Sequence, residues 1–281
     1  MERLRPNLFV IGAMKSGTTS LHAYLGSHPQ IFMCPEKEPS FFAKETVWSR
    51  GEDWYLKLFA AAESEPVIGE SSTAYSRIPK FPGVPERIAR FNPAARLIYV
   101  MRDPVERSVS QYWFHVRFWG EKRDIATAIR QHRPYTDASN YAMQIAPYIR
   151  LFGADNIATL TFEELSKNTL PVMQKLFHWL GVDMSFMPPN LDQRENVTPQ
   201  IIVLPKTGLL NYVGRALKPL IPSRMFLLTK RLLQRYEYVD RNSSSVEEVI
   251  EFLRPIQKEQ VAILEKMLNR KFPEWTTLYD N

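Results

Sequence analysis

The sequence contains a single cysteine, Cys34, in 281 residues. One thiol excludes an intrachain disulfide framework and a metal cluster held by several cysteines. No segment approaches the ~20 consecutive apolar residues of a membrane span. Residues 1–7 are charged and precede no apolar signal-peptide core. We therefore expect a cytoplasmic protein without a membrane span, while peripheral contact with a membrane surface stays open.

Signatures of nucleic-acid binding are also missing. There is no zinc-finger spacing, no aromatic RNA-recognition motif and no long basic arm. The formal net charge of +6 still favours anionic partners, although a solvated basic surface is the plainest explanation of so mild an excess. With 44% hydrophobic residues, the chain can build one substantial core. The composition therefore predicts one domain over 1–281 that does not bind nucleic acid.

The most informative stretch runs from Asn7 to Phe42. A short apolar segment from Leu8 to Ile11 predicts a strand, and apolar residues recur at helical spacing from Leu21 onward. Between them lies a glycine-containing loop. A strand, such a loop and a helix N-terminus together form an anion cradle, because backbone N–H groups and the helix dipole both favour negative charge. The expected ligand is a phosphate or a group shaped like one.

The loop differs from the Walker A motif of nucleoside triphosphatases. Gly12 and Gly17 have the Walker A spacing, but Thr18 stands where the motif requires lysine. The lysine lies three positions earlier, at Lys15. This order speaks against a kinase or NTPase, whose lysine must reach the β- and γ-phosphates. An ordinary tight turn remains the alternative.

A second motif begins where a continuous apolar strand ends at Arg102. Asp103, Pro104 and Glu106 then stand at the N-cap, N1 and N3 positions of a helix. Arg102 should therefore lie at the carboxyl end of a strand, with Ser110 about two turns into the following helix. The planar guanidinium suits a dianionic phosphate. The alternative is an arginine that only holds a neighbouring carboxylate.

Strand-like and helix-like segments alternate along the chain, which predicts an α/β fold with a central parallel β-sheet flanked by helices. The predicted strands are Leu8–Ile11, Ile31–Met33, Val67–Glu70, Leu97–Met101 and Asn156–Thr161. Helical spacing also predicts a helix from Pro171 to Leu180 and two amphipathic segments after residue 245.

Taken together, the two motifs resemble those of sulfotransferases that use 3′-phosphoadenylyl sulfate (PAPS) as donor. The resemblance covers about residues 7–182 and implies the P-loop-like nucleotide-binding fold of that family. It implies that the first loop binds the 5′-phosphosulfate and that Arg102 and Ser110 bind the 3′-phosphate. The donor-binding residues implied are Lys15, Ser16, Gly17, Thr18, Thr19, Ser20, Arg102 and Ser110.

The segment from Glu38 to Phe42 resembles the heparan-sulfate-type and bacterial branches of the family. In those branches, a glutamate shortly before a Phe-Phe pair acts as the catalytic base. The resemblance therefore implies Glu38 as base and Lys15 as a second catalytic residue, with no metal required. Glu36 is a rival for Glu38, and a histidine such as His115 could replace it.

The resemblance implies transfer of a sulfuryl group from PAPS to a hydroxyl of an unidentified acceptor, with release of PAP. The acceptor could be a carbohydrate, a lipid or a small alcohol, anionic or carrier-bound. We expect a donor-binding core over 7–182, an acceptor-side region or lid over 183–245 and C-terminal helices over 246–281. Part of 200–235 should border the acceptor and be more mobile than the sheet. A P-loop-type kinase or NTPase, and a non-catalytic nucleotide- or polyanion-binding protein, are the alternatives.

Overall fold

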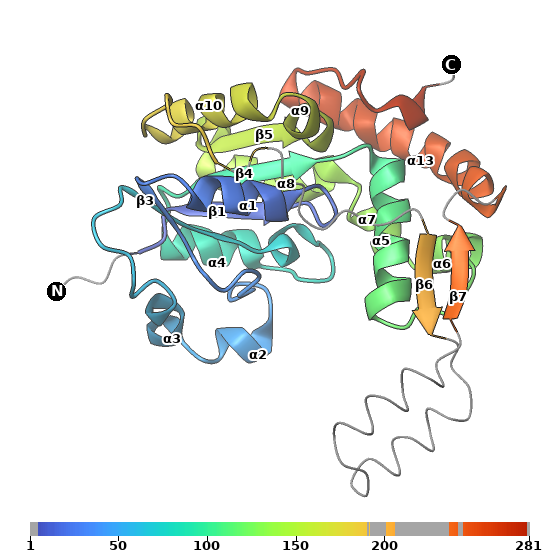
Figure 1. The fold of residues 1–281 in the computed structure, drawn as a ribbon, viewed down its shortest axis with the longest axis horizontal. Helices are drawn as coiled ribbons and strands as arrows, with labels where there is room; N and C mark the ends of the chain where they lie inside the picture. Colours follow the sequence, from blue (N-terminus) through green and yellow to red (C-terminus); the bar gives the residue numbers. More distant parts are fainter. Residues whose placement is uncertain (1–4, 190, 192–200, 206–235, 241–243, 280–281) are drawn as a thin grey trace, which may run out of the picture.

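A parallel sheet of five strands forms the centre of the molecule (Figure 1). The computed structural model describes residues 5–189, 191, 201–205, 236–240 and 244–279. The strand order is β2-β3-β1-β4-β5, and the strands are β1 Leu8–Gly12, β2 Ile31–Met33, β3 Val67–Ser71, β4 Arg96–Met101 and β5 Ile157–Thr161. The predicted α/β fold with a central parallel sheet is confirmed.

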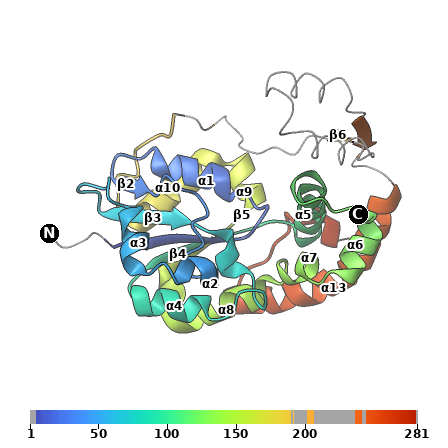
Figure 2. The same cartoon turned by 90° about the horizontal axis from the view of Figure 1, so that it is seen from below.

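Helices cover both faces of this sheet (Figure 2). One face packs against α1 Thr18–Gly26 and α10 Thr169–Leu180, and the other against α4 Val84–Phe91 and α8 Tyr141–Phe152. The remaining helices of the described residues are α2 Glu45–Trp48, α3 Glu52–Lys57, α5 Pro104–Phe118, α6 Ile125–Gln131, α7 Pro134–Asp137, α9 Phe162–Lys167 and α13 Ser244–Leu268. Short 3₁₀ helices are η1 Thr73–Ser76, η2 Ala154–Asn156 and η4 Thr276–Leu278.

The strands are buried on both faces, which explains why they appear in the sequence as continuous apolar runs. Along β1, Leu8 and Val10 join the apolar cluster under α1 and α10. Phe9 and Ile11 alternate with them and join the cluster under α4 and α8. All four side chains are fully buried, so β1 is the centre of the core.

The order of the strands fixes where a ligand can lie. β1 pairs with β3 on one side and with β4 on the other, all in parallel. The chain first continues to the β2 edge and then crosses β1 to reach β4. A crevice opens at the carboxyl ends of the strands at such a switch point. The loop after Gly12 and the residue after Met101 both lie at this point.

The two amphipathic segments predicted after residue 245 form one helix, α13, which continues through Pro255. A proline inside a helix removes one backbone hydrogen bond, but the apolar face stays intact. Val249, Leu253, Val261 and Leu264 on this face are buried in the core. The two predicted segments thus form a single α-helix, and among the described residues the short η4 follows it.

The region predicted to border the acceptor lies largely outside the described residues, which omit 206–235. On either side of that gap, β6 Ile201–Pro205 and β7 Tyr236–Asp240 pair antiparallel as a separate two-stranded sheet. The assignments of 183–245 and 200–235 to the acceptor side stay predictions.

Candidate active site

The loop between β1 and α1 ends in an open helix N-terminus. Gly17 is the N-cap of α1, in the left-handed conformation with φ of 85°, and no side chain caps the helix. The N–H groups of Thr18 and Thr19 therefore lack intrahelical acceptors. A Cβ on Gly17 would lie 2.9 Å from Cδ2 of Phe162 on α9, so this packing requires glycine. The open N–H groups and the helix dipole suit an anionic group.

Lys15 and Ser16 complete the loop. The ammonium of Lys15 lies 4.9 Å from the ring centroid of Phe114, a cation–π contact that ties the loop to α5. Ser110 lies one turn earlier on the same helix and is buried. Within the described residues, the buried hydroxyl of Ser16 has no hydrogen-bond partner. A buried polar group without a partner is costly, so a ligand oxygen in the loop would satisfy it.

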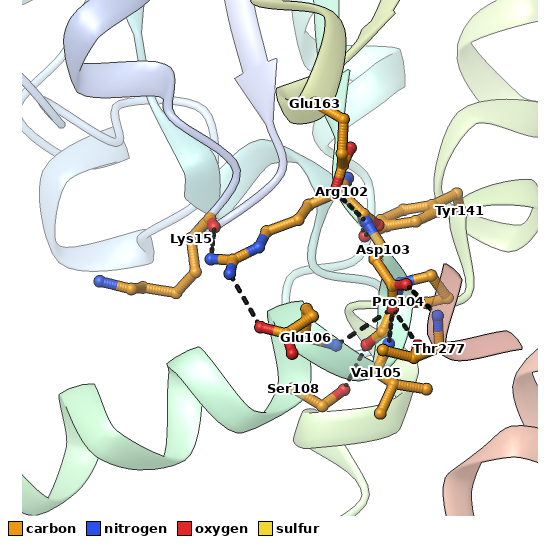
Figure 3. A network of polar contacts seen from close by, with 10 residues as sticks. All are labelled: Lys15, Arg102, Asp103, Pro104, Val105, Glu106, Ser108, Tyr141, Glu163 and Thr277. Atoms are coloured by element: carbon orange, nitrogen blue, oxygen red, sulfur yellow. Dashed lines mark hydrogen bonds and ion pairs between the residues drawn. The ribbon is translucent and has the colours of Figure 1, made fainter. Parts of the chain in front are cut away.

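Arg102 follows β4 and reaches across to the loop (Figure 3). Its Nη1 donates to the carbonyl oxygen of Lys15 at 3.4 Å, and its Nη2 lies 3.1 Å from Oε2 of Glu106. The ion pair with Glu106 is the alternative role that the sequence left open. These two contacts use a minority of the five guanidinium N–H donors, so Arg102 can still bind a phosphate. In Figure 3 the Lys15 ammonium points away from Arg102.

Asp103 caps α5 as the sequence predicts, accepting from the backbone N–H groups of Val105 and Glu106. In a capping box, the side chain at N3 would accept the backbone N–H of the N-cap residue. Here Oε1 of Glu163 on α9 accepts the backbone N–H of Asp103 instead, at 3.0 Å. Thr277 in η4 adds two donors: its backbone N and its Oγ1 lie 3.0 and 2.5 Å from the Asp103 carboxylate. The Asp103 cap, Glu163 on α9 and Thr277 in η4 therefore fix the N-terminus of α5 beside Arg102 (Figure 3).

Replacing Thr277 by Val tests this anchor. We expect the free energy of unfolding to fall by about 1–3 kcal/mol, because a hydroxyl donor to a carboxylate is lost. Chemical denaturation measures the change. Thr276→Val is the matched control, since Thr276 is exposed and should change stability by less than about 0.5 kcal/mol. Equal stability of the two variants would show that the Asp103 contact contributes nothing.

Glu38 lies in the segment after β2. Its Oε2 accepts the backbone N–H of Thr73 at 2.8 Å, and the Thr73 hydroxyl donates to Oε1 at 3.1 Å. The ammonium of Lys37 lies 3.1 Å from Oε1, and the Glu38 side chain is 36% exposed. The carboxylate is thus held in one orientation by η1 and still accessible to a substrate.

Backbone strain is concentrated at the predicted catalytic residues. Among the described residues, those other than glycine with positive φ are Lys15 (71°), Glu38 (62°), Ser40 (56°) and Asn269 (47°). This conformation is costly for side chains with a Cβ and persists where the surroundings enforce it. Both predicted catalytic residues belong to this small group, together with Ser40 and Asn269.

Glu70 supports the segment that carries the predicted base. It is fully buried, and its carboxylate accepts from the hydroxyls of Tyr55 at 2.6 Å, Tyr75 at 2.5 Å and Ser72 at 2.7 Å. Ser72 Oγ in turn accepts the backbone N–H of Ser40 at 2.9 Å. Burial raises the pKa of Glu70 from 4.5 to about 7, because the hydroxyl donors only partly offset the desolvation of the charged form.

The rival bases have different surroundings. Glu36 is exposed. Nδ1 of His22 lies 2.8 Å from Oγ of Ser71, and burial together with the charge of Lys37 lowers the pKa of His22 to about 4. His115 is buried on α5, and burial also lowers its pKa to about 4. The assignment of Glu38, and not one of these, stays a prediction.

The structure joins the two sequence motifs through the contact between Arg102 and Lys15, but no hydrogen bond joins Arg102 to Ser110. Sequence reasoning missed the supporting residues Glu70, Phe162 and Thr277. The first two had a visible signal, because each follows or ends a predicted strand at the ligand-binding edge. Nothing in the sequence pairs Thr277 with an aspartate 174 positions earlier.

A phosphate-type loop facing an arginine at a switch point of a parallel sheet is typical of nucleotide-binding α/β proteins. The sequence model of the sulfotransferase domain family matches residues 5–201, and the chain belongs to that family. A solved sulfotransferase from Alicyclobacillus acidocaldarius is 25% identical, with a TM-score of 0.70 over 97% of this chain and 99% of that one. The predicted sulfotransferase fold is therefore confirmed.

Curated relatives include members from eukaryotes. The membrane-associated sulfotransferase kil1 of Dictyostelium discoideum is 34% identical over 160 residues, which cover 50% of this chain and 33% of kil1. Mouse heparan sulfate glucosamine 3-O-sulfotransferase 5 is 24% identical over 202 residues, 67% of this chain and 55% of that protein. The chain thus spans between a third and just over half of these relatives. The heparan sulfate enzyme and the Alicyclobacillus structure agree with the predicted likeness to the heparan-sulfate-type and bacterial branches.

None of the described helices combines the length and the apolar character needed to span a bilayer. No group of three or more His, Cys, Asp or Glu side chains in the described part of the chain could hold a metal ion. The absence of a metal requirement stays a prediction.

Proposed function

We propose that this chain transfers the sulfuryl group of PAPS to a hydroxyl of an acceptor and releases PAP. The observation that carries the proposal is the contact between Arg102 and the Lys15 carbonyl at 3.4 Å, which brings two motifs of the family to one edge of the sheet. Glu38 approaches the same edge from the segment after β2, since its backbone N–H bonds to Ser71 O at the end of β3. Membership of the sulfotransferase domain family supports the reaction class.

The residues present fit the donor. The open N-terminus of α1 and the unpartnered hydroxyl of Ser16 would hold the 5′-phosphosulfate. Arg102, with Ser110 on the adjoining helix, would hold the 3′-phosphate. The full set of proposed donor-binding residues is Lys15, Ser16, Gly17, Thr18, Thr19, Ser20, Arg102 and Ser110.

In the proposed reaction, PAPS supplies the sulfuryl group. Glu38 takes the proton of the acceptor hydroxyl as its oxygen bonds to sulfur, because the carboxylate is already oriented by Thr73. Lys15 and the N–H groups at the start of α1 stabilise the negative charge left on the departing phosphate oxygen. The protein contributes mainly position and charge, as in phosphoryl transfer.

A desalted sample incubated with labelled PAPS and a panel of sugars, lipids, phenols and secondary alcohols tests the proposal. We expect labelled product and PAP without added metal. Activity that requires Mg²⁺ and consumes ATP would instead identify a kinase or NTPase. PAP binding without transfer to any member of the panel would favour a non-catalytic binding protein.

Replacing Arg102 by Ala should remove most of the preference for PAP over AMP, which differ by the 3′-phosphate. A charge-assisted hydrogen bond contributes about 1.5–3 kcal/mol, so PAP affinity should fall by roughly 10–100-fold while AMP affinity changes little. Calorimetry measures both. Arg90→Ala, at an exposed position on α4, is the matched control. Equal losses of affinity for PAP and AMP would show that Arg102 does not bind the 3′-phosphate.

The cytoplasmic location and the absence of nucleic-acid partners stay predictions. So does the division of the chain into a donor core, an acceptor-side region and a C-terminal part.

A further inference from the structure

A cavity near the proposed base is lined by none of the proposed donor-binding residues. It has a volume of about 310 Å³ and is lined by side chains from the segment after η1, from α5 and its end, and from the α6–α7 turn. The residues that matter are Arg77, Lys80, His115, Trp119, Glu121 and His132. A second hollow of about 310 Å³ shares Arg77 and Lys80 with it and extends along Ile78 and Pro134.

Among the described residues, no carboxylate forms an ion pair with the Arg77 or Lys80 side chains that line the cavity. Arg77 is half-buried, and within the described residues no carboxylate lies within ion-pair distance of its guanidinium. Burial lowers the pKa of Arg77, although the Glu38 carboxylate opposes this. Lys80 lies close enough to Arg77 for that charge to lower the pKa of its ammonium, after burial as the main cause. The cavity's own carboxylate, on Glu121, is already bound to Arg123 at 2.5 Å. Such a site favours an anion.

His115 lines the cavity and has a ring nitrogen without a hydrogen-bond partner in the described part of the chain. Its side chain is 6% exposed, and its Nδ1 bonds to the Tyr135 hydroxyl at 2.8 Å. Its Nε2 is buried and has no hydrogen-bond partner in the described part of the chain. Because burial and the charge of Arg77 lower the pKa of His115 to about 4, the imidazole is neutral near pH 7. A polar group of a ligand that reached Nε2 would satisfy this buried atom.

Hydrogen bonds from Arg107 hold the α7 segment beside His115, and Trp119 adds an exposed aromatic ring. The buried guanidinium of Arg107 donates to the Tyr135 carbonyl and to Oγ of Ser139, which holds the α7 segment in place. Trp119 stacks on His115 with ring centroids 4.4 Å apart and is 56% exposed. The open face of Trp119 can pack against a sugar or aromatic ring.

The cavity is adjacent to the proposed base through η1. Thr73, which binds the Glu38 carboxylate, begins η1, and Arg77 directly follows it. The effect of Glu38 on the pKa of Arg77 also places the two charges near each other. On the other side, His115 adjoins Phe114, the residue on which Lys15 packs. The cavity therefore adjoins residues that contact both proposed catalytic side chains.

From this geometry we propose that the cavity is the acceptor site and that the acceptor is a hydroxylated ring compound bearing an anionic group. Arg77 and Lys80 bind the anion, which is a carboxylate, sulfate or phosphate. His115 Nε2 bonds a polar group, and Trp119 packs on the ring. The assignment rests on the proposed function, because it takes Glu38 as the group that receives the acceptor's proton.

Matched pairs of probes test the proposal on PAP-saturated protein. Methyl β-D-glucuronide carries a carboxylate that methyl β-D-glucoside lacks. Likewise, 4-hydroxybenzoate is charged whereas 4-hydroxybenzamide is neutral. Calorimetry should show that the charged member of at least one pair binds about tenfold or more tightly. With labelled PAPS, the same member should be the better acceptor. Equal binding within both pairs, or no binding of any probe, would overturn the proposal.

Variants connect the preference to the cavity. Arg77→Gln should abolish the difference within the pair, and His115→Phe should weaken both members while PAP affinity stays unchanged. Lys57→Gln, an equal loss of charge at an exposed position on α3, should leave the difference intact. A preference that survives Arg77→Gln would place the anion elsewhere. If the parent protein does not bind PAP, the proposed function itself is rejected. If it transfers the sulfuryl group to neutral acceptors alone, only the anionic site is rejected.

Discussion

Turnover should fall by roughly 10²–10⁴-fold when Glu38 is replaced by Gln. The amide keeps the size of the side chain and can still contact Thr73, but it cannot accept the proton of an acceptor hydroxyl. PAP affinity should stay near that of the parent protein, because no donor-binding role is assigned to this side chain. Steady-state assays with labelled PAPS and calorimetry with PAP measure the two quantities separately.

Glu36→Gln is the matched control, since it makes the same change two residues away at an exposed position. It should retain nearly full turnover. If Glu36→Gln or His22→Asn loses activity while Glu38→Gln keeps it, the base has been assigned to the wrong residue. A loss of PAP affinity in Glu38→Gln would mean that the carboxylate organises the donor site instead.

The second large effect concerns Glu70 and pH. Its pKa is raised from 4.5 to about 7 by burial, so the folded protein holds this proton more tightly than the unfolded chain. The stability that Glu70 contributes is then complete below pH ~4.5 and is lost as the pH rises through about 7. A shift of this size corresponds to about 3 kcal/mol of unfolding free energy.

Glu70→Gln isolates this contribution, because the amide is neutral at every pH and can still accept from Tyr55 and Tyr75. Denaturation measured between pH 5 and 8 should show a smaller loss of stability in the variant than in the parent protein. Glu86→Gln, on the surface of α4, is the control and should follow the parent. Parallel curves for the parent and Glu70→Gln would show that Glu70 is ionised throughout this range.

The fold could be predicted because its strands are buried on both faces. Such strands are short continuous apolar runs, and every predicted strand of the central sheet appears in the structure. Helix ends were predictable where local chemistry sets them, as with Asp103 at the start of α5 and Gly181 after α10. The continuity of α13 was not, since tertiary packing of its apolar face outweighs the local penalty of Pro255.

The candidate site divides in the same way. The loop from Lys15 and the strand-end Arg102 have local signatures, because backbone geometry and charge at a helix N-terminus demand particular residues nearby. The Glu70 cluster and the cavity around Arg77 have none, because they depend on side chains that meet only after folding. Tyr55 lies 15 positions before Glu70 and Tyr75 lies 5 positions after it, and neither spacing belongs to a recurring pattern.

The contact between Asp103 and Thr277 also bears on the order in which the protein is made. All five strands of the sheet have left the ribosome soon after residue 161, and α13 follows with residue 268. The helix start beside Arg102 gains its last donors only when residue 277 emerges. A nascent chain can therefore form its central sheet well before the anchor beside Arg102 is complete. Synthesis itself separates the formation of the scaffold from the completion of the site.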